Sequence, residues 1–157
     1  PTNTKYYILG TREESTSAST SKGFVFQLNS SREVQARIFT TTSNITQVNA
    51  GVVTNGIWAN VAFTYVASSK TLKIFKNGTE VGSATGTAAG VTSPDSISIG
   101  KAATGGQYSY FDGNIDEVSI WNTALSQSAI TEIASGPNDL TSLSNASNTN
   151  LKAWYKF

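Results

Sequence analysis

Apolar and polar residues alternate with a period of two along most of the chain. The segments KGFVFQLN (22–29) and EVQARIF (33–39) each place an apolar residue at every second position. This alternation is typical of strands that turn one face toward a core. Residues 30–32 lie between the two segments and predict a hairpin turn, while residues 5–11 predict a further strand and residues 44–53 a weaker one.

The clearest strand signal lies in the middle of the chain, in the segment GIWANVAFTYVA. Residues at alternate positions of this segment predict one buried face: Ile57, Ala59, Val61, Phe63 and Tyr65. The segment TLKIFKNGTEVGSA follows, and its Asn77 and Gly78 tolerate the positive φ values of a two-residue hairpin turn. We therefore expect two strands that meet at this pair.

One helix is predicted after a long strand that covers residues 113–122. Ser126 is suited to the N-cap, because a hydroxyl accepts a hydrogen bond from an amide that the helix leaves unpaired. Apolar residues at spacings of three and four follow it, and Gly136 and Pro137 favour the end of the helix. Residues 136–150 are polar and predict a loop.

Short strands at residues 96–100 and 151–157 complete the pattern. About ten strands, one helix and no β–α–β alternation predict an all-β fold, an antiparallel β-sandwich with one short surface helix. Neither an internal repeat nor a second domain is visible, so we expect a single domain over residues 1–157.

Composition narrows the function. The net charge is +1 with scattered Lys and Arg, which disfavours nucleic-acid binding. No apolar run approaches the ~20 residues of a membrane-spanning helix, so membrane insertion is not expected. The chain has no Cys and no His, which excludes a thiolate nucleophile, Ser-His-Asp chemistry and an imidazole zinc site.

Two adjacent carboxylates, Asp116 and Glu117, raise the question of catalysis. Retaining glycoside hydrolysis needs two carboxyl groups ~5 Å apart across the scissile bond. Consecutive residues of a strand point to opposite faces, so this pair is a poor acid–base pair, and Glu13 and Glu14 share the defect. We therefore expect no enzymatic activity.

Asp116 has the same strand phase as Val118 and Ile120, which points it toward the core. A buried carboxylate needs hydrogen bonds, so we expect it to accept backbone amides from a neighbouring loop and to have a structural role. A metal role is the alternative. The tryptophans Trp58, Trp121 and Trp154 lie inside strand patterns and are interpreted as core residues rather than ligand platforms.

Two segments resemble a known family. GIWANVAFTYVASSKTLKIFKNGTEVGSATG resembles the "G-x-W-x-x-V-A-x-T-Y … L-x-I-Y-x-N-G" core of laminin-G-like, concanavalin A-like jelly rolls. FDGNIDEVSIWNTALSQSAITEI resembles their "G-x-I-D-E-V-x-I-W/Y-N-x-A-L-S-x-x-E-I" signature, a segment that is also similar in pentraxins. The resemblance covers roughly residues 24–136 and implies a jelly-roll β-sandwich.

The chain also departs from this family. Two strands that usually open the domain, one like "F-D-G-x-x-D-Y" and one like "F-T-x-S-x-W-V", do not appear before Lys5. The domain is thus expected to lack its first strands, or to receive them from elsewhere. NLKAWYKF resembles the usual opening strand, so residues 151–157 either close this sandwich or begin a following repeat.

Calcium is the commonest cofactor of the family that the chain resembles. Residues 101–104 stand where a pentraxin-type site needs acids, which disfavours that site. A laminin-G-type site, made of one or two Asp plus backbone carbonyls, could use Asp112 or Asp95. No cofactor is expected otherwise.

A glycan site is the most specific functional hypothesis. Lectin sites pair an aromatic face with amide, hydroxyl and carboxylate groups on loops. A Gly-flanked loop offers Gln107, Tyr108, Tyr110 and Asp112, and a second polar loop offers Arg12. The alternative is that the aromatic residues of the first loop only cover a sheet edge.

These features favour a non-catalytic carbohydrate-binding or adhesion module of a virion or cell-surface protein, located outside the cell or on the virion surface. Its expected partner is a glycan or a host-surface receptor. The alternative is a structural or assembly module that makes protein–protein contacts with neighbouring chains in a particle or filament. Sheet edges left open by missing strands favour this alternative, because unpaired backbone groups invite strand addition.

Overall fold

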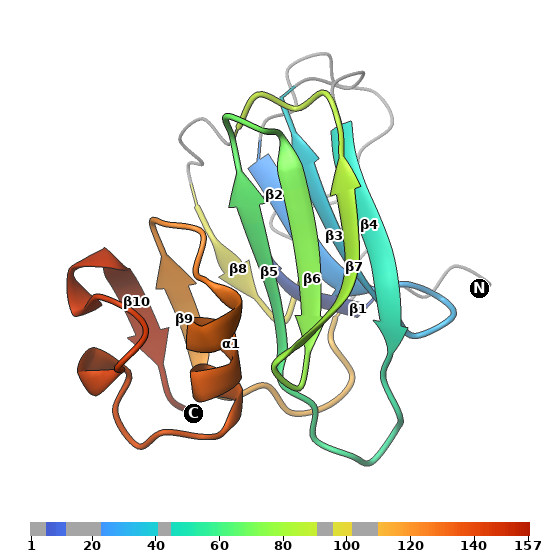
Figure 1. Ribbon diagram of the computed structural model, residues 1–157. Helices are drawn as coiled ribbons and strands as arrows, with labels where there is room; N and C mark the ends of the chain where they lie inside the picture. The colour runs from blue at the N-terminus through green and yellow to red at the C-terminus, as the bar shows by residue number, and fades with distance from the viewer. Residues whose placement is uncertain (1–5, 12–22, 41–44, 91–95, 102–109) are drawn as a thin grey trace.

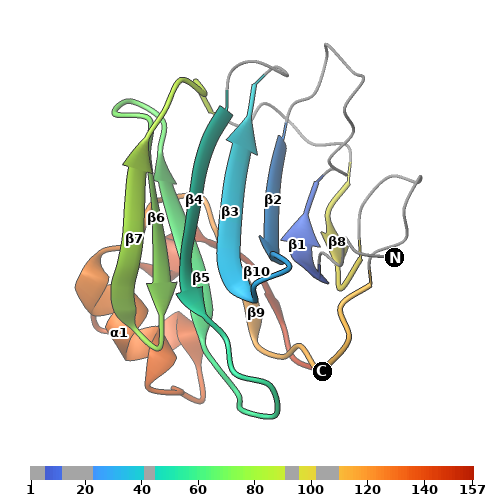
Figure 2. The same cartoon turned by 90° about the vertical axis from the view of Figure 1, so that its right-hand side faces the viewer.

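The computed structural model describes residues 6–11, 23–40, 45–90, 96–101 and 110–157. The strands form two facing layers (Figure 1), and Figure 2 shows the strands of the larger sheet, β4, β3, β2, β1 and β8, side by side. One layer is a five-stranded antiparallel sheet in the order β4-β3-β2-β1-β8. Its strands are β1 (Tyr6–Gly10), β2 (Gly23–Leu28), β3 (Glu33–Phe39), β4 (Ile45–Val52) and β8 (Ser98–Ile99).

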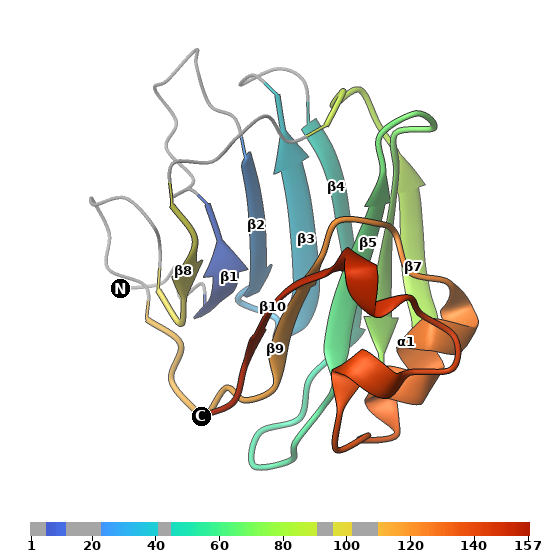
Figure 3. The ribbon, with the colours of Figure 1, turned by 90° about the vertical axis from the view of Figure 1, so that its left-hand side faces the viewer.

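The second layer contains a three-stranded antiparallel sheet in the order β5-β6-β7. Its strands are β5 (Val61–Val66), β6 (Thr71–Lys76) and β7 (Thr79–Thr85). The antiparallel pair of β9 (Val118–Trp121) and β10 (Leu151–Tyr155) continues this layer beyond β5, as Figures 1 and 3 show. The predicted antiparallel β-sandwich with one short helix is confirmed.

The core lies between the two layers. The predicted inward face of β3 is confirmed, because its alternate residues are all buried, and each such aliphatic side chain contributes about 1.5–3 kcal/mol to folding. The buried residues of this cluster are Leu9, Phe26, Leu28, Val34, Ala36, Ile38, Val48, Leu72, Ile74 and Ala88.

Both predicted hairpin turns are confirmed. Asn77 (φ 50°) and Gly78 (φ 78°) connect β6 to β7 with positive φ at both positions, as a type I′ turn requires. In the turn between β2 and β3, the side-chain oxygen of Asn29 accepts hydrogen bonds from the backbone amides of Ser31 and Glu33. Local turn chemistry therefore fixes the register of both hairpins.

The helix α1 (Gln127–Ala134) begins at the predicted cap, because the Ser126 Oγ accepts a hydrogen bond from the Ala129 amide at 3.2 Å. The side chains of Gln127 and Thr131 both donate to the Gly78 carbonyl, so α1 packs on the β6–β7 turn. Among the described residues, no helix is long and apolar enough to cross a lipid bilayer.

Three predicted boundaries were wrong. The strand expected over residues 113–122 is only β9, because Glu117 has φ 54° and interrupts the extended backbone. The strand expected from residue 56 begins at Val61, and Ile57 is 66% exposed. The expected polar loop over residues 136–150 contains two 3-10 turns, η1 (Leu140–Ser142) and η2 (Asn148–Asn150).

Candidate functional site

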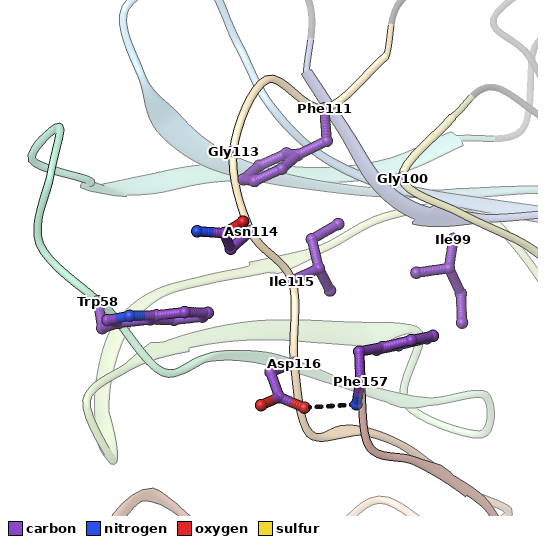
Figure 4. Close-up of a pocket in the computed structure, with 9 residues that line it drawn as sticks. All are labelled: Trp58, Ile99, Gly100, Phe111, Gly113, Asn114, Ile115, Asp116 and Phe157. Atoms are coloured by element: carbon purple, nitrogen blue, oxygen red, sulfur yellow. Dashed lines mark hydrogen bonds between the residues drawn. The ribbon is translucent and has the colours of Figure 1, made fainter.

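A pocket of about 500 Å³ lies where the segments before β5 and β9 meet the end of the chain (Figure 4). Its walls are mainly aromatic and aliphatic, and among the described lining residues the polar side-chain groups are the Trp58 indole N–H, the Asn114 amide and the Asp116 carboxylate. The lining residues are Trp58, Ile99, Gly100, Phe111, Gly113, Asn114, Ile115, Asp116 and Phe157.

Trp58 lines the pocket, and its interpretation as a core residue was wrong. It is 68% exposed, and it precedes β5 rather than belonging to it. Gly56, two residues earlier, has φ 74°, so the backbone turns here and the strand alternation does not extend back to Trp58. Trp121 and Trp154 are half-buried within β9 and β10.

Asp116 holds the end of the chain. Its Oδ1 accepts hydrogen bonds from the backbone amides of Phe157 at 2.9 Å and of Glu117 at 2.8 Å. These bonds, that of Phe157 first, lower the pKa of Asp116, because they favour the charged carboxylate. Asp116 is exposed, so its expected burial was wrong: the positive φ of Glu117 breaks the phase that was counted back from Val118.

Glu117 also contacts the last strand. Its Oε2 accepts a hydrogen bond from Trp154 Nε1 at 2.5 Å, and its Oε1 lies 3.9 Å from the Lys156 ammonium. The two adjacent carboxylates do not lie on opposite faces of one strand as expected, because both precede β9. Each instead bonds to the segment 154–157 that follows or ends β10.

The segment 110–116 forms a row of mostly exposed residues with two half-buried ones among them. Phe111 and Ile115 are half-buried, and between and around them lie the exposed residues Tyr110, Asp112, Asn114 and Asp116. The Phe111 amide donates to the Gly100 carbonyl at 2.8 Å, and Lys101 pairs with Tyr110 in an isolated bridge. These bonds fix the row at the rim of the five-stranded sheet.

Two of the predicted ligand residues, Tyr110 and Asp112, therefore lie together beside the pocket, and Tyr110 is 59% exposed. The other three, Arg12, Gln107 and Tyr108, lie outside the described residues. Sequence reasoning missed Asn114, Trp58 and Phe157. The alternation of polar residues through YFDGNID was a visible signal for Asn114, whereas the approach of Phe157 depends on chain folding.

No group of three or more acidic, His or Cys residues that could hold a metal ion occurs in the described ranges. Asp112 is exposed on the row, and Asp95 lies outside the described residues. A calcium role for these two residues stays a prediction.

Solved structures with the same architecture include carbohydrate-binding modules. The CBM40 domain of the Ruminococcus gnavus IT-sialidase aligns with a TM-score of 0.68 at 16% identity, over 85% of this chain and 76% of that chain. The same domain bound to α2,3-sialyllactose aligns with a TM-score of 0.64 at 16% identity, over the same shares.

A native heptameric SAP-like pentraxin from Limulus polyphemus aligns with a TM-score of 0.58 at 15% identity, over 98% of this chain and 74% of that chain. At these identities the likeness shows the fold, a lectin-like jelly-roll sandwich, as the sequence predicted. A search of curated proteins found no match.

The family assignment rests on the sequence itself. The family model of the concanavalin A-like lectin/glucanases superfamily matches residues 2–131, which includes every strand from β1 to β9. The chain therefore belongs to the concanavalin A-like lectin/glucanases superfamily.

Proposed function

We propose that this domain is a non-catalytic carbohydrate-binding or adhesion module that binds glycans along the row 110–116. The observation that carries the proposal is the set of exposed polar side chains of Tyr110, Asp112 and Asn114 on a segment whose start is held at the sandwich rim by backbone pairing with residues 100 and 101.

The pocket adds an aromatic surface beside this row. Figure 4 shows the Trp58 indole extending into the pocket below the Asn114 amide. A sugar ring that packs its C–H groups on the indole would bring its hydroxyls to the amide and to the Asp116 carboxylate. Lectin sites combine these features, an apolar face and a few convergent polar groups.

The carboxylates favour binding over hydrolysis. Asp116 and Glu117 bond to the end of the chain, and they do not face each other across a cleft. The structural neighbours named CBM40, one of them bound to α2,3-sialyllactose, support the same proposal by analogy of fold. The setting we propose is extracellular or on a virion surface, with a glycan or a host-surface receptor as partner.

A glycan array followed by calorimetry tests this proposal. We expect binding of at least one glycan, with α2,3-sialyllactose as the first probe, and a loss of about tenfold or more in affinity for Tyr110→Ala and Asn114→Ala. Val81→Ala, on the outer strand β7, is the matched control and should bind like the parent. An array without any binding, or parental affinity in Tyr110→Ala, would overturn the proposal.

Calcium is a separate proposal that rests on Asp112. Calorimetric titration with Ca²⁺ after chelation should give a saturable heat in the parent protein and none in Asp112→Ala. If the parent gives no heat, calcium plays no part in the site.

An assembly role is the second candidate function. It is favoured by two strands of the front layer, β5 and β9, each of which pairs on only one side within the described part of the chain. An open strand edge can bind another chain through main-chain hydrogen bonds.

A further inference from the structure

Two Asn–Gly pairs occur in the sequence, Asn55–Gly56 and Asn77–Gly78. The first pair lies in a turn between β4 and β5, and the second lies in the turn between β6 and β7. An asparagine that precedes glycine is open to a reaction with its own backbone, because glycine has no side chain to shield its nitrogen. The fold holds the two turns to different degrees, so it predicts which pair reacts.

The reaction is an intramolecular deamidation. The backbone nitrogen of glycine attacks the side-chain carbonyl carbon of asparagine, a C–N bond forms, and the amide group leaves with the glycine N–H proton as ammonia, which gives a cyclic succinimide. Water then adds to one of the two ring carbonyls, and its second proton returns to the nitrogen. Opening at the side-chain carbonyl gives aspartate, and opening at the backbone carbonyl gives isoaspartate. Water and ammonia balance the reaction, and nothing is oxidised or reduced.

The attack requires the turn to rotate until the glycine nitrogen meets the asparagine carbonyl carbon. Reactions of this kind depend on the geometry of the approach. A turn that hydrogen bonds hold in another conformation must first open, and the rate then falls with the population of the open form.

The Asn77–Gly78 turn is held on both of its residues. The Asn77 amide donates to the Asn60 carbonyl at 2.8 Å, and the Asn77 Oδ1 accepts a hydrogen bond from the Asn60 amide at 3.0 Å. Gly78 is buried, and its carbonyl accepts hydrogen bonds from the Thr131 Oγ1 at 2.9 Å and from the Gln127 side chain. Rotation of this turn would therefore break its bonds to α1 and to the segment before β5.

The Asn55–Gly56 turn lacks this support. Both residues are exposed, and the Asn55 side chain makes no hydrogen bond within the part of the chain that the structure describes. The bond that closes the turn runs from the Ile57 amide to the Thr54 carbonyl at 3.4 Å, which is longer than the usual range of about 2.7–3.2 Å. A Cβ at Gly56 would meet nothing within 4 Å, so no neighbouring group restrains the rotation.

The place of this turn gives the reaction a consequence. Figures 1 and 3 show the segment between β4 and β5 projecting beyond the ends of the strands. Trp58, three residues after Asn55, extends from this segment into the pocket (Figure 4). Deamidation adds a negative charge at position 55, and isoaspartate also lengthens the backbone by a methylene group. The path of the chain just before Trp58 must then change.

We propose that Asn55 is a site of spontaneous deamidation in the folded protein, whereas the contacts with Asn60 and α1 protect Asn77. The modification changes the charge beside the pocket and the position of the Trp58 indole as the protein ages. It consumes only water, so it proceeds without an enzyme. It does not depend on glycan binding, and either proposal can fail without the other.

Peptide mapping by mass spectrometry during incubation at mildly alkaline pH tests the proposal. Both pairs are followed in the same sample, once in native protein and once in urea. In urea the two asparagines should react at rates within about threefold of each other, because only the local sequence then acts. In native protein Asn55 should stay within about threefold of its rate in urea, whereas Asn77 should slow by about tenfold or more, because its turn must open first. Native Asn55 slowed as strongly as Asn77, or native Asn77 as fast as Asn55, would overturn the proposal.

A variant of α1 tests the protection of Asn77. Thr131→Val keeps the size of the side chain and removes one hydrogen bond to the Gly78 carbonyl. It should speed the deamidation of Asn77 in native protein about fivefold, the effect of about 1 kcal/mol, and leave Asn55 unchanged. An unchanged rate at Asn77 would contradict the protective role of α1.

The effect on the pocket has its own measurement. As deamidation proceeds, the indole N–H signal of Trp58 in the NMR spectrum should split into old and new positions, while the signals of Trp121 and Trp154 stay in place. Asn55→Gln is the control, because the longer side chain cannot close the succinimide ring, and its Trp58 signal should remain single. A single Trp58 signal in parent protein that has reacted at Asn55 would show that the pocket does not respond, against the proposal.

Discussion

At the scale of single residues, Asp116 makes the clearest prediction. Its pKa lies below its ordinary value of 3.8, because the amides of Phe157 and Glu117 bond to the charged form. The folded state thus prefers the carboxylate, and the resulting stability is present above about pH 4 and is lost as pH falls through the lower folded pKa. Asp116→Asn should lower the Tm at pH 7, and the difference from the parent should shrink below about pH 4.

Thermal scans from pH 2.5 to pH 7 measure this difference. Asp112→Asn is the matched control, since its carboxylate accepts no hydrogen bond from the described residues, and its Tm difference should stay small across the range. A parent–variant difference in Asp116→Asn that does not change with pH would contradict the assigned role.

Residue identities alone could suggest that Asp116 accepts backbone amides, but not that it lies in solvent. That inference assumed an unbroken strand, and one left-handed residue, Glu117, invalidates it. A non-glycine residue at positive φ is not visible in the sequence. The exposure of Trp58 was missed for a similar reason. The alternation of apolar residues in the sequence begins at Ile57, whereas β5 begins only at Val61.

At the scale of elements, the contact between α1 and the β6–β7 turn makes the next prediction. A Cβ at Gly78 would lie 3.1 Å from Ala134 Cβ and 3.1 Å from Thr131 Cα, and its φ is 78°. Gly56 has a similar φ of 74° with nothing within 4 Å, so it is a matched control. Gly56→Ala should cost about 1–2 kcal/mol from backbone strain alone. Gly78→Ala should cost about 1–3 kcal/mol more, because the methyl group crowds the helix.

Urea unfolding of the two variants gives both free energies. If Gly78→Ala and Gly56→Ala lower the free energy of unfolding equally, α1 moves away from the new methyl group without destabilising the fold. The packing of α1 on the β6–β7 turn would then contribute little to stability.

The elements that the sequence predicted best are those with local causes. The cap at Ser126 and the pair Asn77 and Gly78 each rest on a hydrogen bond or a backbone preference between near neighbours. Their partners in space, such as the Gly78 carbonyl for Thr131, are 53 positions apart, and no local rule predicts them. The row 110–116 lies between these cases: its alternation is local, whereas its place beside Trp58 is not.

At the scale of the whole molecule, the fold class followed from alternation and turn residues, since a sheet needs one apolar face to pack on another. The division of the front layer could not be predicted in the same way. This division depends on which strands pair with each other. The alternation of apolar and polar residues in a strand is the same whether the strand pairs on one side or on both, so it does not predict the pairing.

The C-terminal unit of β9 and β10 is less strongly coupled to the sandwich than the other strands, because β9 pairs only with β10 among the described strands. β9 contacts a strand on one side only within the described residues and has no buried residue, whereas β3 pairs on both sides and holds the most buried side chains. Native-state amide exchange in low denaturant should therefore show Ile120 opening at a free energy several kcal/mol below that of Ala36. If Ile120 and Ala36 open together, the two parts unfold as one unit, and that result would contradict the weaker coupling of β9 and β10.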